Sequence, residues 1–158
     1  MKVKKIFIIN LISLFFLFSL DRLSKFYILQ QNNLKPNFNI EVTSFLDFNL
    51  VWNQGIAFGL LAFDDVLIYN FISFIIALVI TFLIIQSFRE ESFRRYVYLL
   101  ICGGALGNFY DRVAYGAVVD FIDFNYNNFH WFIFNVADIM ITVGILILIL
   151  SEFLTKDE

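Results

Sequence analysis

The chain has 158 residues, of which 60% are hydrophobic and 20% aromatic, and its mean hydropathy is +0.78. This composition is too apolar for an ordinary soluble domain and predicts one integral membrane domain over residues 1–158, in contact with membrane lipid. Because the net charge is −3, no basic patch is available to neutralise phosphates, so we do not expect nucleic acid as a partner.

Four segments approach or reach the roughly 20 apolar residues that a helix needs to cross a bilayer. They cover residues 6–29, 66–88, 96–113 and 132–154. The first follows several lysines, as the apolar part of a signal peptide does, but no small-residue cleavage site comes after it, so we predict a permanent span. The expected fold class is an all-α integral membrane protein with four transmembrane helices and both termini on one side.

The basic residues predict which side that is. Seven basic residues lie on the side of the termini: Lys2, Lys4, Lys5, Arg89, Arg94, Arg95 and Lys156. Four lie on the other side: Arg22, Lys25, Lys35 and Arg112. By the positive-inside rule the first side is cytoplasmic. Both termini are then expected in the cytoplasm, and the loops 30–65 and 114–131 lie outside.

The first outer loop carries two local patterns. Over residues 46–52 every second residue is large and apolar, which predicts a strand with one face on an apolar surface. We therefore expect a small extracytoplasmic β-sheet lying on the membrane. Residues 53–59, from Asn53 through Gly55 to Gly59, follow directly. Such a glycine-bracketed segment either holds an extended substrate backbone or forms a tight turn back to the membrane.

The third segment has polar residues on one helical face. Gly104, Gly107, Asn108 and Asp111 recur at i, i+3, i+4 and i+7, with Arg112 at the edge. This face is predicted to point into the helix bundle, since lipid cannot satisfy its polar groups. We interpret Asp111 as structural, and both a functional and a scaffold role stay open for Asn108 and Arg112.

Aspartates follow in the last third of the chain. Asp120 and Asp123 lie in a short apolar stretch, and in an extended strand they would point to opposite faces, one toward the bundle and one toward water. In a helix beginning at Phe132, Asp138 would lie about 9 Å inside, one turn after Asn135. A carboxylate there is costly unless it faces a cavity or a partner.

Asp120 and Asp138 are the leading candidates for an active site. Two carboxylates at one mouth of a membrane bundle can share a proton and carry out acid/base chemistry. Asp21, near the outer end of the first span, is as consistent with a structural hydrogen bond as with catalysis. The single Cys102 and the single His130 lack the partners of a metal site or a catalytic triad, and Cys102 is predicted to be a packed thiol.

In combination, these motifs resemble the lipoprotein signal peptidases (signal peptidase II), bacterial membrane enzymes that remove signal peptides from lipid-modified prolipoproteins. The likeness covers essentially the whole chain, and its elements occur in family order. They are residues 21–25, 53–59, 103–108 with Asp111-Arg112, 119–121, and Phe134-Asn135 with Ala137-Asp138. One departure is Trp131-Phe132-Ile133, where the family often has Trp-Pro.

The resemblance implies an aspartic-type signal peptidase, a hydrolase with Asp120 and Asp138 as the catalytic pair, and it favours Asp120 over Asp123. The positions that match substrate-binding or supporting residues are Asp21, Lys25, Asn53, Gly55, Gly104, Asn108, Arg112 and Asn135. No metal and no cofactor are implied. The implied substrates are diacylglyceryl-modified prolipoproteins, cleaved on the N-terminal side of the lipidated cysteine by a monomer in the bacterial cytoplasmic (inner) membrane, at its extracytoplasmic face.

Two other classes of function are open at this stage. In a small transporter or proton-coupled channel, Asp138, Asp21 and Arg112 would line a path across the bilayer. The almost wholly apolar stretch 144–150 argues against such a path. In a noncatalytic scaffold, the polar residues would only lock the helices together, and replacing the aspartates would unfold the protein.

Overall fold

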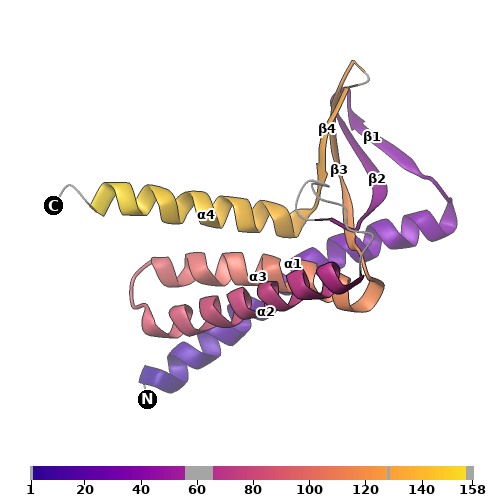
Figure 1. The fold of residues 1–158 in the computed structure, drawn as a ribbon. Coiled ribbons are helices and arrows are strands. Elements are labelled where there is room, and N and C mark those ends of the chain that lie inside the picture. Colours follow the sequence, from indigo (N-terminus) through magenta and orange to yellow (C-terminus); the bar gives the residue numbers. More distant parts are fainter. Residues whose placement is uncertain (1, 56–65, 128, 156–158) are drawn as a thin grey trace.

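The computed structural model describes residues 2–55, 66–127 and 129–155, which form a helical bundle with an antiparallel sheet at one end (Figure 1). In chain order the elements are α1 (Lys2–Leu34), β1 (Asn39–Thr43), β2 (Leu46–Asn53), α2 (Val66–Arg89), α3 (Arg94–Tyr115), β3 (Val118–Tyr126), β4 (Phe129–Phe134) and α4 (Val136–Thr155). The first turn of α1, the α2–α3 connection and the last turn of α4 lie at the end of the bundle away from the sheet.

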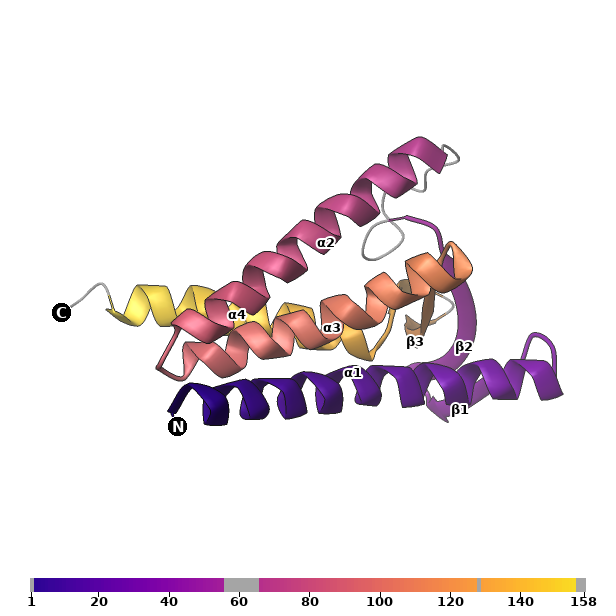
Figure 2. The same cartoon turned by 90° about the horizontal axis from the view of Figure 1, so that it is seen from below.

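Three helices in the described part of the chain are long and apolar enough to cross a membrane. They cover Lys4–Leu34, Leu67–Arg89 and Val136–Leu154. The remaining helix, α3, coincides with the third predicted segment, but its glycines and polar residues lower its hydropathy. It packs against the other three helices (Figure 2). The four-span topology and the cytoplasmic termini stay predictions.

The core of the bundle follows from the small residues of α3. Gly104 brings α3 against the carbonyl oxygen of Ala137 in α4, and Gly107 lies against the Asp21 side chain of α1. A larger residue at either position would hold the helices apart. Cys102 is fully buried in an apolar cluster with neighbours from α2 and α3, which confirms the predicted packed thiol.

The sheet has the strand order β1-β2-β3-β4, and its neighbouring strands are antiparallel. Strand β2 confirms the strand predicted at 46–52. The sheet packs on the last turns of α1, where Ile28, Phe38 and Phe121 form a second apolar cluster. A β-bulge interrupts the register of β2 with β3 between Phe48 and Val51. Bulges redirect side chains, and Val51 is then paired with Asp120.

Two expectations about the aspartates were wrong. The last helix begins at Val136 and not at Phe132, because residues 129–134 pair with β3 as an edge strand, so Asp138 lies in the first turn of α4. Asp123 points away from Asp120 but does not meet water. It is 0% exposed, since Asn49 of β2 donates to it at 2.9 Å and His130 of β4 contacts it at 2.8 Å.

Candidate active site

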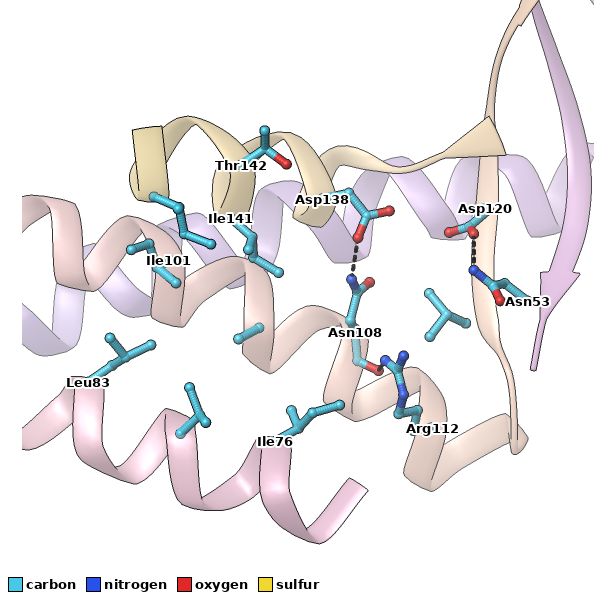
Figure 3. Close-up of a pocket in the computed structure, with 14 residues that line it drawn as sticks. Asn53, Ile76, Leu83, Ile101, Asn108, Arg112, Asp120, Asp138, Ile141 and Thr142 are labelled. Carbon is cyan, nitrogen blue, oxygen red and sulfur yellow. Dashed lines mark hydrogen bonds between the residues drawn. The ribbon is translucent and has the colours of Figure 1, made fainter. Parts of the chain in front are cut away.

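The two candidate aspartates, from β3 and α4, line the same cavity (Figure 3). This cavity of about 270 Å³ lies between α2, α3, α4 and the sheet. Its polar lining residues are Asn53, Asn108, Arg112, Asp120 and Asp138 at one end, and Thr142 further along α4. The rest of the wall is mainly aliphatic, with side chains such as Ile76, Leu83 and Ile101. The cavity therefore joins a carboxylate-lined end to an apolar arm between helices.

Asp120 is held by two amide side chains. Asn53 Nδ2 donates to its Oδ2 at 2.8 Å, and Asn135 Nδ2 donates to its Oδ1 at 2.6 Å. Burial and the negative charge of Asp138 raise the pKa of Asp120 to about 7, against the opposing effect of the two amides and of Lys25. Near neutral pH this carboxyl can therefore both take up and release a proton, as acid/base chemistry requires.

Asp138 is fixed by the start of its own helix. Asn135 is the N-cap residue, and its Oδ1 accepts the backbone N–H of Asp138 at 3.0 Å, while Asp138 Oδ2 accepts the backbone N–H of Asn135 at 3.2 Å. This reciprocal arrangement is a capping box. The positive end of the helix dipole favours a carboxylate here. Asn108 Nδ2 donates to the other oxygen, Oδ1, at 2.8 Å.

Asn135 connects the two aspartates. Besides its bond to Asp120, its Nδ2 donates to Asn108 Oδ1 at 3.1 Å, and Asn108 in turn donates to Asp138. Asn135 is 0% exposed. One buried amide therefore caps α4, orients Asp120 and supports the residue that orients Asp138.

An ion cluster supports the pair from the side of α1. Lys25 Nζ lies 3.1 Å from Asp21 Oδ2 and 2.7 Å from Asp111 Oδ2, and it donates to Asn108 Oδ1 at 2.8 Å. Asp21 Oδ1 accepts the backbone N–H of Ala137, at the start of α4, at 3.1 Å. Asp111 accepts the backbone N–H of Val119 in β3 at 3.2 Å. Both aspartates therefore anchor the elements that carry the candidate pair.

Arg112 and Gly55 form the edge of the site next to Asn53. Arg112 donates to the carbonyl oxygens of Asn108 at 3.2 Å and Gly55 at 3.3 Å. Asn53 Oδ1 accepts the backbone N–H of Gly55 at 2.8 Å. Residues 56–59 of the predicted motif lie outside the described residues.

The structure thus brings together Asp21, Lys25, Asn53, Gly55, Gly104, Asn108, Arg112, Asp120, Asn135 and Asp138, and it leaves Asp123 on the other face of the sheet. Sequence reasoning did not single out Arg22 as a site residue, although it pairs with Asp21 and Asp111. The available signal was the group of charges at 21–25 inside an apolar helix, where charges are tolerated when paired. Among the described residues, no group of three or more histidine, cysteine or acidic side chains is arranged to hold a metal ion.

Comparisons with known proteins agree with the motifs. The family model described as signal peptidase (SPase) II matches residues 13–154. The lipoprotein signal peptidase of Pelagibacter ubique (strain HTCC1062) is 47% identical over 154 residues, which are 98% of this chain and 93% of that protein. The lipoprotein signal peptidase of Francisella tularensis subsp. novicida (strain U112) is 43% identical over 124 residues, 76% of this chain and 77% of that protein.

Solved structures show the same architecture. One described as a bacterial membrane enzyme at 2.3 Å resolution superimposes with a TM-score of 0.77 at 31% identity, and the match covers 94% of this chain and 88% of that one. A second structure with the same description at 1.9 Å resolution has a TM-score of 0.71 at 31% identity and covers 90% of both chains.

Proposed function

The chain belongs to the signal peptidase II family, and from this premise we propose that it is an aspartic endopeptidase of the bacterial cytoplasmic membrane. Its substrates are diacylglyceryl-modified prolipoproteins, and it cleaves on the N-terminal side of the lipidated cysteine. The observation that carries the proposal is that Asp120 and Asp138 line one cavity and that Asn135 connects them: its side-chain amide donates to Asp120 and accepts the backbone N–H of Asp138.

The proposed reaction needs one ionised and one protonated carboxyl. The ionised carboxylate takes a proton from water as the water oxygen attacks the scissile carbonyl carbon, and the protonated carboxyl donates to the carbonyl oxygen. The resulting gem-diol collapses, the C–N bond breaks, and a proton passes to the leaving amine. The raised pKa of Asp120, about 7, supports a pair that holds a single proton near neutral pH.

The shape of the cavity supports a membrane-embedded substrate. Its apolar arm, between α2, α3 and α4, suits the hydrophobic part of a signal peptide, and its polar end suits the peptide bond that follows. A helical signal segment would unwind locally to present that bond, and the end of β2 that carries Asn53 would hold it. In this proposal α3 also crosses the membrane, so that there are four spans; the termini are cytoplasmic, and the sheet lies at the extracytoplasmic face.

The test is cleavage of a diacylglyceryl-modified prolipoprotein by the purified protein in lipid. Asp120→Asn and Asp138→Asn should abolish cleavage, with a loss of at least about a thousandfold. Asp123→Asn is the matched control, because Asp123 is a buried aspartate on the same strand that points to the other face. It should retain cleavage. Circular dichroism checks that each variant is folded.

Three results would contradict the proposal. The first is well-folded native protein that does not cleave the substrate in several lipid mixtures, and the second is full activity in Asp120→Asn or Asp138→Asn. The third is unfolding of both variants, which would favour the scaffold role. Solute or proton flux in vesicles that depends on Asp138 would instead favour the transporter role.

A further inference from the structure

Arg22 is part of the ion cluster beside the candidate pair. Its Nη1 donates to Asp111 Oδ1 at 2.6 Å, and its Nη2 and Nε donate to Asp21 Oδ2 at 2.6 and 3.2 Å. The Arg22 side chain is 17% exposed, and both carboxylates are fully buried. One guanidinium therefore bridges two buried acids on different helices.

The charges of the cluster balance only if Arg22 is included. Asp21 and Asp111 contribute two negative charges, and Lys25 contributes one positive charge. Arg22 adds the second positive charge and makes the cluster neutral. Removing one partner from a buried ion pair leaves an uncompensated charge, which is far more costly than the absence of the pair.

The contacts are suited to arginine more than to lysine. The planar guanidinium reaches both carboxylates at once, which a single ammonium group does less well. The Cζ atom of Arg22 also lies 4.8 Å from the ring centroid of Tyr110 and 5.9 Å from that of Phe18. These cation–π contacts further stabilise the positive charge of Arg22.

Two hydrogen-bonded paths lead from this cluster to Asp138. In the first, Asp21 accepts the backbone N–H of Ala137, the residue before Asp138. In the second, Lys25 donates to Asn108, and Asn108 donates to Asp138. Arg22 pairs with Asp21 directly, and it pairs with Asp111, which also pairs with Lys25. A change at Arg22 therefore reaches the candidate pair through both paths.

We propose that Arg22 is a positioning residue for the catalytic aspartates. It neutralises Asp21 and Asp111 so that Lys25 can hold Asn108 and Asp21 can hold the start of α4, and it thereby sets the charge balance under which the pair shares its proton. This inference rests on the proposed function. It extends that function to a residue outside the cavity.

The test is the pH profile of prolipoprotein cleavage in a set of charge variants. Arg22→Gln leaves an extra negative charge near the pair, which favours the protonated carboxyls, so the profile should move to higher pH by about 0.5–1 unit. Asp111→Asn should move it to lower pH. The double variant, in which the cluster is neutral again, should return to the native profile, and Arg22→Lys should keep the native profile with a lower kcat.

Lys35→Gln is the matched control, because it removes the same charge from an exposed position directly after α1. It should leave the profile unchanged. The inference is overturned if Arg22→Gln has the native profile, if the double variant shifts as far as Arg22→Gln, or if Lys35→Gln produces the same shift. If Arg22→Gln does not fold, Asp111→Asn decides, since a profile that does not move to lower pH excludes the charge balance.

An NMR titration of the Asp120 carboxyl carbon in native protein and Asp111→Asn measures the same shift without turnover. This separates the two proposals. Absence of cleavage in the native protein would contradict the proposed function, whereas an unchanged Asp120 titration would contradict the role of the cluster.

Discussion

Replacing Asn135 should damage both the fold and the chemistry, and the two effects can be separated. Asn135→Ala removes the N-cap acceptor of α4, which costs about 1 kcal/mol. It also removes the donors to Asp120 and Asn108, at roughly 1 kcal/mol each. The structure therefore predicts a loss of about 2–4 kcal/mol in the free energy of unfolding, because all of these bonds are buried.

Asn135→Ser isolates the cap from the donors. Serine keeps an N-cap acceptor but cannot reach Asp120 as the amide does, so it should recover about 1 kcal/mol of the stability while cleavage stays as low as in Asn135→Ala. Equilibrium unfolding in detergent micelles, followed by circular dichroism, gives the stabilities, and prolipoprotein cleavage gives the activity. Equal stability of the two variants would refute the capping role. Native cleavage by Asn135→Ser would refute the importance of the bond to Asp120.

Three further predictions concern pH, close packing and a distant contact. The pKa of Asp120 is raised from 3.8 to about 7, so the protonated carboxyl stabilises the fold fully below pH 3.8, and this stabilisation is lost as the pH rises to about 7. The free energy of unfolding measured across this range should therefore fall with pH, and Asp120→Asn should reduce the slope. An unchanged slope in Asp120→Asn would contradict the raised pKa. In Gly104→Ala the new Cβ would lie 2.5 Å from the carbonyl oxygen of Ala137, which should lower the free energy of unfolding by about 1–3 kcal/mol and lower cleavage. Gly116→Ala is the control: its Cβ would enter open space at φ 69°, so it should cost about 1 kcal/mol and leave cleavage intact. Equal cleavage by the two variants would argue against the close approach of α3 and α4. Asn10 donates to Ser87 between α1 and α2, so Asn10→Leu should lower stability by about 1 kcal/mol with native cleavage, and a loss of cleavage in the folded variant would show coupling that the contacts do not explain.

The local elements of this protein could be read from the sequence because their signals are local. Long apolar runs identify α1, α2 and α4 as helices able to cross a membrane, and a period of two identifies β2. The same local reading misplaced the start of α4. Six mostly aromatic residues suit a strand as well as a helix, and only pairing with β3 selects the strand. The Asn135 to Asp138 spacing is the capping signal that would have placed the start correctly.

The sequence alone determined which residues are costly in a membrane, because a carboxylate, an amide or an arginine in an apolar segment must find a partner or a cavity. It did not determine which residues are the partners of each polar side chain. Asp120 and Asp138 meet through Asn135, Asp111 meets Lys25 and Arg22, and Asp123 is covered by His130. Most of these contacts join different elements, so they arise when the helices and the sheet pack together, and only the tertiary structure decides them.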